Sequence, residues 1–289
     1  YIFIAFLILV IGCNKKNDNI SIAKEGDNII TLENNLISIS FSRENGIICS
    51  LIDKEKDIEF VAFQDYSNPF NLEWHDKLEC SFESFSYRKD SSFDAGVGYI
   101  LEWKVNEDIL VRGKIQVPSN SDEIHFYSEV ENNTNEEILS LEYPMISNLG
   151  NITPNGEKDY LAHSYASGFL IKNPLRSFDS PGKGLRYAPY PEGMHGSPMQ
   201  FFTYYGEGRG GLYFACHDGD FHRKWLNFFK NGNSLLLASF MHGNEDIQPK
   251  KGMSVAYPVI VKLLKEGSWY EAADIYKEWA TRQVWCQKG

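Results

Sequence analysis

The residue types best suited to chemistry gather in one polar stretch, residues 187–225 of the 289-residue chain. The stretch holds a Glu–His pair and a His–Asp pair, and either pair suits the transfer of a proton to or from a substrate. A tryptophan near its end offers a flat apolar face that suits stacking on a sugar ring. No fixed spacing makes either pair specific, so we treat five residues as candidates for binding a sugar substrate: Glu192, His195, His217, Asp218 and Trp225.

Metal binding is an alternative role for part of this stretch. His217, Asp218, Asp220 and His222 are plausible ligands, and the oxygen-rich run Asp-Gly-Asp suits calcium. The two histidines lie across a turn, however, and do not form the helical pair of a zinc protease, while Asp-Gly favours a hairpin turn on its own. We therefore predict no metal and no cofactor, with a structural calcium ion left open.

Other chemistries find no support in the surrounding sequence. The glycine-rich run 206–211 lies between two strand-like segments and lacks the Lys-Ser/Thr pair and the following helix of a phosphate loop. No Gly-x-Ser-x-Gly motif of a serine hydrolase occurs. The chain carries 28 Lys+Arg against 39 Asp+Glu, a formal charge of −11. Because phosphate binding needs clustered cations, we predict no nucleic-acid partner.

Strands must position these residues, because alternating apolar and polar side chains recur through most of the chain. The pattern predicts strands at 36–41, 47–52, 99–105, 111–117, 123–130, 199–205, 211–215, 234–240 and 255–261. Turn residues separate them at hairpin intervals, which indicates antiparallel strands in two large packed sheets. Residues 148–197 are rich in Gly, Pro and Asn, and we expect them to form ordered loops that cross one face of the sandwich.

The two ends of the chain carry signals of a different kind. Near the C-terminus, Ser268 and Glu271 fit a capping box, and apolar residues follow at helical spacing up to Ala280. At the start, an apolar run too short to span a membrane ends in Val10-Ile11-Gly12-Cys13, which resembles a bacterial lipobox. We therefore expect lipidation of Cys13 and a lipoprotein exported to the outer membrane or the periplasmic face. The alternative is a buried N-terminal strand.

The remaining cysteines, Cys49, Cys80, Cys216 and Cys286, show no Cys-x-x-Cys or zinc-ligand spacing. We expect most of them to be small buried apolar residues, with one or two disulfides left open.

Several motifs together resemble one family. They are a hairpin at 34–54, a Ser-Pro-Met-Gln-Phe strand at 197–201, the hairpin Leu212-Tyr213-Phe214-Ala215-Cys216-His217-Asp218, and the helix 269–280 followed by Trp285-Cys286. The chain is similar to the N-terminal region of bacterial glycoside-hydrolase-like lipoproteins, a domain of unknown function that resembles endo-α-N-acetylgalactosaminidases. The resemblance implies an all-β, galactose-mutarotase-like β-supersandwich, joined by a C-terminal helix to a (β/α)8 barrel that carries the catalytic carboxylates.

The resemblance predicts four segments: a lipoprotein signal at 1–13, a linker at 14–28, the supersandwich at 29–266, and a helix at 267–289 leading to a barrel absent from this sequence. No residue here corresponds to the catalytic carboxylates, so we expect the chain to be inactive by itself. We expect the His195 loop and the His217-Asp218 hairpin to face that barrel.

The leading prediction for function is the non-catalytic sandwich domain of an exported, lipid-anchored glycoside hydrolase acting on a glycan, with a retaining mechanism in the barrel. Two alternatives remain open. One is a carbohydrate-binding surface lipoprotein. The other is an aldose epimerase that uses a histidine acid and a glutamate base on the sandwich itself, with His163, His195 and His217 as the histidines to test.

Overall fold

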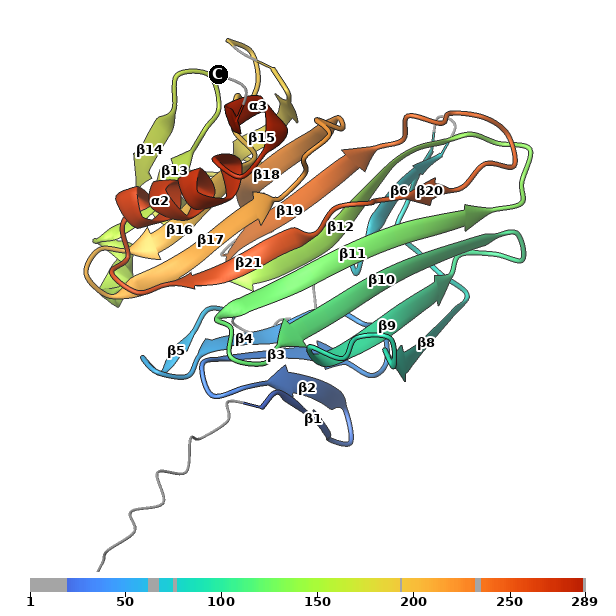
Figure 1. The fold of residues 1–289 in the computed structure, drawn as a ribbon, viewed down its shortest axis with the longest axis horizontal. Coiled ribbons are helices and arrows are strands. Elements are labelled where there is room, and N and C mark those ends of the chain that lie inside the picture. The colour runs from blue at the N-terminus through green and yellow to red at the C-terminus, as the bar shows by residue number, and fades with distance from the viewer. Residues whose placement is uncertain (1–19, 62–67, 75–76, 193, 232–234, 288–289) are drawn as a thin grey trace, which may run out of the picture.

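The computed structural model describes residues 20–61, 68–74, 77–192, 194–231 and 235–287. In this part of the chain, three antiparallel sheets contain most of the regular structure (Figure 1). The prediction of an all-β protein built from antiparallel sheets is confirmed. Figure 1 places the C-terminal helices over one end of the largest sheet, beside β13 (Asp159–His163), β16 (Phe201–Gly206) and β17 (Gly210–Cys216).

The strands and helices have the following bounds. The five-stranded sheet runs in the order β1 (Ile22–Glu25), β2 (Ile29–Glu33), β3 (Ile37–Ser42), β4 (Ile48–Asp53), β5 (Ile58–Glu59). The ten-stranded sheet runs in the order β14 (Phe169–Lys172), β13 (Asp159–His163), β16 (Phe201–Gly206), β17 (Gly210–Cys216), β21 (Val259–Leu264), β11 (Glu123–Asn132), β10 (Ile109–Pro118), β9 (Gly96–Lys104), β8 (Ser84–Lys89), with β20 (Met253–Ser254) also paired to β11. The six-stranded sheet runs in the order β15 (Gly184–Tyr190), β18 (Lys224–Asn231), β19 (Leu235–Gly243), β12 (Ile138–Leu149), β6 (Asn71–Trp74), β7 (Lys77–Glu79). The helical segments are η1 (Pro154–Gly156), α1 (Pro174–Ser177), α2 (Trp269–Ala280) and α3 (Val284–Gln287).

The apolar core is built by strict alternation along the strands. On β10 every second side chain is buried, and half-buried polar residues such as Arg112 lie between them. Buried residues from all three sheets contribute to one large cluster, in which Phe41, Trp103, Phe126 and Phe240 come from four strands, and a smaller cluster lies between helix α2 and β16, β17 and β21. Burial of such large rings contributes most of the free energy that holds sheets together. Because the large cluster draws side chains from all three sheets, it joins them into one sandwich.

Helix α2 begins where the sequence predicts it. The Ser268 hydroxyl accepts a hydrogen bond from the Glu271 backbone N–H at 3.3 Å, as a capping residue does. The Glu271 carboxylate bonds to residues that precede the N-cap residue, rather than to the N-cap residue itself. It accepts from the backbone N–H groups of Lys265 at 2.6 Å and Glu266 at 3.0 Å. The first turn of the helix is therefore tied to the end of β21.

A glycine allows this close approach. Gly267 has a φ of +67°, and a Cβ at this position would lie 2.2 Å from the carbonyl oxygen of Gly206 and 2.7 Å from the backbone nitrogen of Gly210. Only glycine fits such a position without displacing the backbone around it. The start of α2 thus lies directly on the turn between β16 and β17.

The segment 148–197 differs from the prediction, because it contains strands where we expected loops. β13 pairs with β16, β14 pairs with β13, and β15 pairs with β18. These strands are short, and positive-φ residues such as Asn155, Asn173 and Tyr187 interrupt the alternation around them. Two of the three, β14 and β15, are edge strands of their sheets, where one side of the backbone has no neighbouring strand. The alternation of apolar and polar residues is weak in such strands, so pairing with the neighbouring strand determines their conformation.

The sandwich also extends further toward the N-terminus than predicted. β1 lies within the segment 14–28 that we expected to be a linker, and it pairs with β2 from Ile22↔Glu33 to Glu25↔Ile30. Its side chains are mostly exposed, so its sequence carries little of the alternation that marks a strand. The predicted lipidation residue, Cys13, lies outside the described residues.

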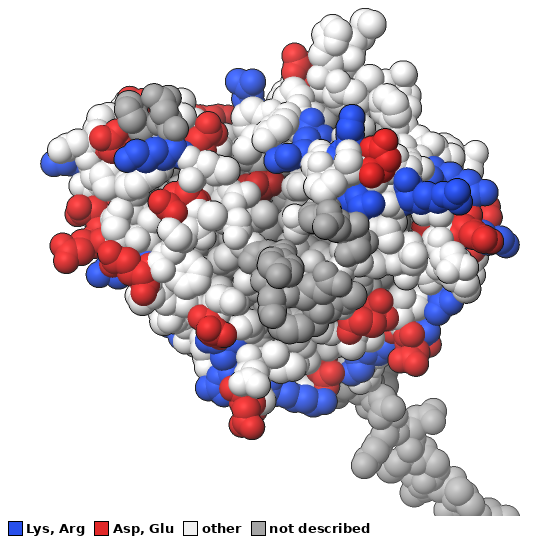
Figure 2. Space-filling model, turned by 180° about the vertical axis from the view of Figure 1, so that it is seen from behind, with Lys and Arg blue, Asp and Glu red and all other residues white. Residues whose placement is uncertain are grey.

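On the face shown in Figure 2, acidic and basic side chains are interspersed around the margin. Within the described part of the chain, no helix is long and apolar enough to cross a membrane. Cys49, Cys80, Cys216 and Cys286 are free thiols, of which Cys49 and Cys216 are buried as predicted, whereas Cys80 is half-buried and Cys286 exposed.

Candidate functional site

Two loops and the C-terminal helices meet at one end of the sandwich (Figure 1). The loop 217–223 connects β17 to β18, and the loop 191–200 leads into β16. The side-chain amide of Gln200 donates to the carbonyl of Asp218 at 2.8 Å, which joins the two loops. Phe221 stacks on Tyr190 and also contacts Trp285 of α3, with ring centroids 6.4 and 4.4 Å away. This loop–helix end holds four of the five predicted site residues.

Asp218 is buried and organises the loop 217–223. Its carboxylate forms an ion pair with the ammonium of Lys224 at 2.5 Å, and accepts from the backbone N–H groups of Asp220 and His222 at 2.9 and 2.7 Å. It also accepts from Nδ1 of His222 at 2.9 Å. Burial alone would raise the pKa of Asp218, but the hydrogen bonds and the Lys224 charge lower it. The carboxylate is therefore ionised and fully engaged with protein groups.

Lys224 is completely buried, which is rare for a lysine. Besides Asp218, its ammonium donates to the side-chain oxygen of Gln200 at 3.2 Å. It also lies over the rings of Tyr190 and Tyr257, at 4.6 and 4.4 Å from their centroids. Burial lowers the pKa of Lys224, and the Asp218 carboxylate opposes that shift. Both charges of the pair are thus satisfied inside the protein.

His217 faces the helix rather than Asp218. Its ring stacks on Trp279 of α2, with centroids 4.8 Å apart and planes 8° apart. Its Nε2 lies 3.1 Å from the hydroxyl oxygen of Tyr213. Burial lowers the pKa of His217 to about 4, so the imidazole is neutral near neutral pH. The side chain therefore anchors α2 to the sheet.

The side chains of the other three predicted residues form no hydrogen bond or ion pair with Asp218, Lys224 or His217 in the described part of the chain. Glu192 and His195 are exposed on the loop 191–200, and Trp225 is half-buried on β18 with the Arg223 guanidinium 5.0 Å from its ring. Among the described residues, no hydrogen bond or ion pair joins Glu192 to His195, or either of them to the loop 217–223. Neither predicted proton-transfer pair is formed. The structure instead brings Asp218 together with His222.

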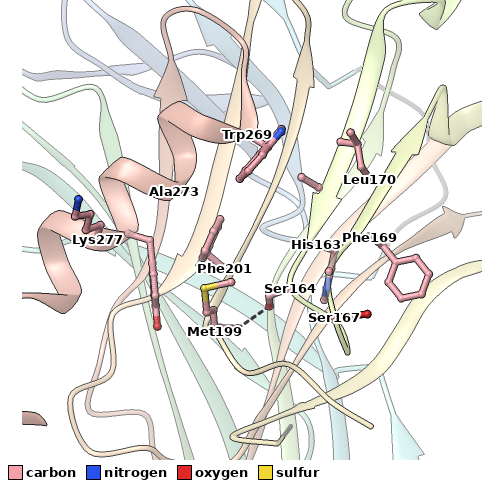
Figure 3. Close-up of a pocket in the computed structure, with 13 residues that line it drawn as sticks. His163, Ser164, Ser167, Phe169, Leu170, Met199, Phe201, Trp269, Ala273 and Lys277 are labelled. Carbon is pink, nitrogen blue, oxygen red and sulfur yellow. Dashed lines mark hydrogen bonds between the residues drawn. The ribbon is translucent and has the colours of Figure 1, made fainter. Parts of the chain in front are cut away.

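A cavity of about 470 Å³ lies beside the same end, between α2, the β13–β14 hairpin and the start of β16 (Figure 3). Figure 3 shows Trp269 and Leu170 on opposite sides of it, with Phe201 and Met199 below Trp269. Ala162, Ala273 and Tyr276 add further apolar surface. The amphipathic pattern of residues 269–280 predicts the helix that forms one side of the cavity. The β13–β14 hairpin forms another side, and the sequence pattern predicted neither of its strands.

Two polar side chains that line this cavity, His163 and Ser164, already have hydrogen-bond partners. Nδ1 of His163 accepts from the backbone N–H of Tyr165 at 3.0 Å, and Nε2 donates to the carbonyl of Leu226 at 3.3 Å. Burial lowers the pKa of His163 to about 4. The Ser164 hydroxyl donates to the carbonyl of Met199 at 2.8 Å. The cavity therefore suits an apolar group better than a hydroxyl-rich one.

We expect Trp279→Ala to loosen helix α2. The substitution removes the stacking partner of His217 and opens the space between the helix and β17, so the free energy of unfolding should fall by about 3 kcal/mol. Urea denaturation followed by tryptophan fluorescence and circular dichroism measures the loss. Tyr270→Ala is the matched control, because Tyr270 is 66% exposed on the same helix; equal losses for the two variants would contradict the anchoring role.

The fold matches solved structures of enzymes named for their action on sugars. The α-N-acetylgalactosaminidase of Bifidobacterium bifidum superposes with a TM-score of 0.61 at 12% identity, covering 87% of this chain and 38% of that chain. The family GH36 α-galactosidase of Geobacillus stearothermophilus gives 0.56 at 10% identity, covering 91% and 43%. Galactose 1-epimerase of Lactobacillus acidophilus gives 0.50 at 8% identity, covering 86% and 98%. No protein-family model and no curated protein matches the sequence.

These likenesses establish the fold. The predicted galactose-mutarotase-like β-supersandwich with a C-terminal helix is confirmed. The chain spans 38% of the length of the acetylgalactosaminidase and nearly all of the epimerase. The same architecture therefore occurs both as a part of larger glycosidases and as an enzyme by itself.

Proposed function

We propose that this chain is the sandwich domain of an exported, lipid-anchored glycoside hydrolase. The observation that carries the proposal is the superposition on 38% of an α-N-acetylgalactosaminidase chain, with a TM-score of 0.61. In the proposal, a (β/α)8 barrel follows the segment 267–289 and carries the catalytic carboxylates, and Cys13 carries the lipid. The sandwich contributes structure and, through the loops 191–200 and 217–223, contacts to the glycan.

The loop–helix end supports a docking role for this domain. Helix α2 is fixed to the sheet at its first turn by Glu271 and Gly267, and at its last turn by the stack of Trp279 on His217. Beside it, Trp269 and Leu170 are 38% and 56% exposed at the apolar cavity. Exposed apolar surface of this kind marks an interaction site. In the proposal, apolar side chains of the barrel fill the cavity, and the barrel is held against this end.

The reaction proposed for the whole protein is glycoside hydrolysis with retention. An acid/base carboxyl and a nucleophilic carboxylate would lie on either side of the scissile bond, both on the barrel. The solved relatives act, by their names, on α-linked N-acetylgalactosamine and galactose, so α-linked galactose-type sugars are the first substrates to test. Glu192, His195 and Trp225 remain candidates for contacts to more distant sugar units, because their side chains are accessible.

The reading frame beyond Gly289 gives the direct test. We expect repeated strand–helix units with Asp or Glu at strand ends, and we expect the longer product to hydrolyse aryl α-N-acetylgalactosaminides or aryl α-galactosides. The 289-residue chain alone should leave the same substrates intact. A stop codon directly after Gly289, or hydrolysis by the 289-residue chain itself, would overturn the proposal.

An aldose epimerase is the second candidate, favoured by the match that covers 98% of a galactose 1-epimerase. Polarimetry of freshly dissolved α-D-galactose tests it. Catalysis of anomerisation that is lost in one of the variants His163→Ala, His195→Ala or His217→Ala would favour this role. The burial of His163 and the stack of His217 on Trp279 make both poor proton donors, so we expect no acceleration.

A further inference from the structure

A second cavity, of about 290 Å³, is lined by His222 of the loop 217–223 and does not include helix α2. It is bounded by the end of β19, the residues that follow it, and the segment 252–257. Its walls are largely polar, in contrast to the apolar cavity beside α2. The side chains that matter for its chemistry are His222, His242, Glu245, Ser254 and Tyr257.

Asp218 sets the orientation of the imidazole of His222. An ionised carboxylate only accepts hydrogen bonds, so the 2.9 Å contact places the imidazole proton on Nδ1 of His222. In the neutral form of the ring, this tautomer places the lone pair on Nε2. Nε2 has no hydrogen-bond partner in the described part of the chain, and the side chain is 33% exposed. The result is a fixed imidazole with a free acceptor atom at the cavity.

The wall behind His222 is rigid. The rings of His222 and Tyr257 lie 5.5 Å apart, and the Tyr257 hydroxyl bonds to Nδ1 of His242 at 2.9 Å. Nε2 of His242 donates to the carbonyl of Tyr143 at 2.9 Å. Burial lowers the pKa of His242 to about 3, so this ring is neutral. A wall held by such a chain of hydrogen bonds is preorganised for a ligand.

The charges around the cavity select the kind of ligand. The buried Lys224 ammonium, 4.4 Å from the Tyr257 ring centroid, is paired with Asp218, so the pair adds little net charge to the cavity. The carboxylates of Glu245 and Asp246 disfavour an anion, and Asp246 is paired with Lys251 at 2.8 Å. Among the described residues, the Glu245 carboxylate has no hydrogen bond, so it is a second free acceptor. A neutral molecule rich in hydroxyl donors fits these conditions.

We propose that this cavity binds a single saccharide ring or a cyclic polyol. Nε2 of His222 and the carboxylate of Glu245 accept hydrogen bonds from ligand hydroxyls, and Asp218 is the positioning residue for His222. The volume lies at the small end of the range for ligand pockets, which limits the ligand to about one ring. The site is independent of the proposed barrel and of the candidate residues on the loop 191–200.

Imidazole NMR on the 289-residue chain tests the proposal. D-galactose, N-acetyl-D-galactosamine, D-glucose and myo-inositol are titrated separately while long-range proton–nitrogen correlations of the histidines are recorded. We expect at least one of the four to shift the Nε2 resonance of His222 saturably and to leave His195 unchanged. An Nε2 resonance of His222 that none of the four moves would overturn the proposal.

Matched variants distinguish this site from binding elsewhere. His222→Gln retains a donor to Asp218 but removes the Nε2 acceptor, and Glu245→Gln removes the carboxylate at an exposed position. Each should weaken binding about tenfold, whereas His195→Gln should not change it. Urea midpoints close to that of the parent chain verify that the variants are folded. Binding that stays unchanged in both cavity variants would place the sugar elsewhere and refute the assignment, whatever the reading frame beyond Gly289 encodes.

Discussion

Lys224→Met is expected to lower the free energy of unfolding by about 4 kcal/mol, because it leaves the buried Asp218 carboxylate without its cation. The two charged atoms are 2.5 Å apart, and both side chains are at most 1% exposed. The backbone N–H groups of Asp220 and His222 still solvate the carboxylate in the variant, which keeps the loss near the middle of the range for broken buried pairs. Urea denaturation at neutral pH measures it. Lys230→Met is the matched control, since Lys230 lies on the same strand and is half-buried, and it should cost roughly 0.5 kcal/mol.

A double-mutant cycle separates the pair from its surroundings. Asp218→Asn alone should also cost about 4 kcal/mol, because it leaves the Lys224 ammonium buried without a counter-charge. The double variant contains neither buried charge, so its loss should be well below the sum of the two single losses. We expect a coupling energy of about 2 kcal/mol or more. Additive losses would mean that the ion pair does not hold the loop 217–223 in place.

Mild acid is expected to lower the stability of the protein through two buried histidines. Burial lowers the pKa of His163 to about 4 and of His242 to about 3, against about 6.5 for unfolded histidine. Above about pH 6.5 both states hold neutral rings, so stability is fully present. As the pH falls below that value, the two imidazoles bind protons in the unfolded chain but not in the folded chain, and the free energy of unfolding decreases. At about pH 4.5 the two rings together should cost about 5 kcal/mol.

The dependence can be measured by urea denaturation at several pH values between neutral and about 4.5. The parent chain should lose stability steadily across this window. The double variant His163→Gln/His242→Gln should start from lower stability, because it breaks bonds to Tyr165 and Tyr257. Its pH dependence should be flatter, with the part that His217 contributes remaining. His195→Gln, an exposed histidine, should retain the slope of the parent. A double variant with the parent slope would assign the acid sensitivity to other groups.

Much of the sandwich follows from local pattern. β3, β4, β9, β10 and β11 lie within a few residues of their predicted bounds, because every second side chain faces one core. β12 and β18 were not predicted. In β12 every residue except Leu139 is buried, so no alternation of buried and exposed side chains marks the strand, and bulges shift its pairing with β19. β18 begins at Lys224, and a charged residue at this position indicates an exposed turn. The lysine is buried only because it forms an ion pair with Asp218, which the local pattern does not show.

The candidate site was predictable in location but not in detail. The sequence places His217 and Asp218 at the end of a strand, and the structure has them there. Adjacent residues nevertheless point to different partners, His217 to Trp279 and Asp218 to Lys224, and no spacing rule encodes that divergence. The pairing of Asp218 with His222 depends on the loop closing over four residues. The apolar cavity depends on β13 and β14, whose positions are fixed by pairing to β16.

The attachment of α2 to the sheet is unequal along its length. Its first turn is fixed through backbone atoms, by Gly267 on the β16–β17 turn and by Glu271 on the N–H groups of Lys265 and Glu266. Its C-terminal half is held by side-chain rings, Tyr276 on Phe201 and Trp279 on His217, and not by backbone atoms. Local opening of the helix should therefore begin at Ala280 and travel backward, so amide protons near Ala280 exchange before those near Ala272. The Trp269 wall of the apolar cavity stays in place while the far end of the helix opens.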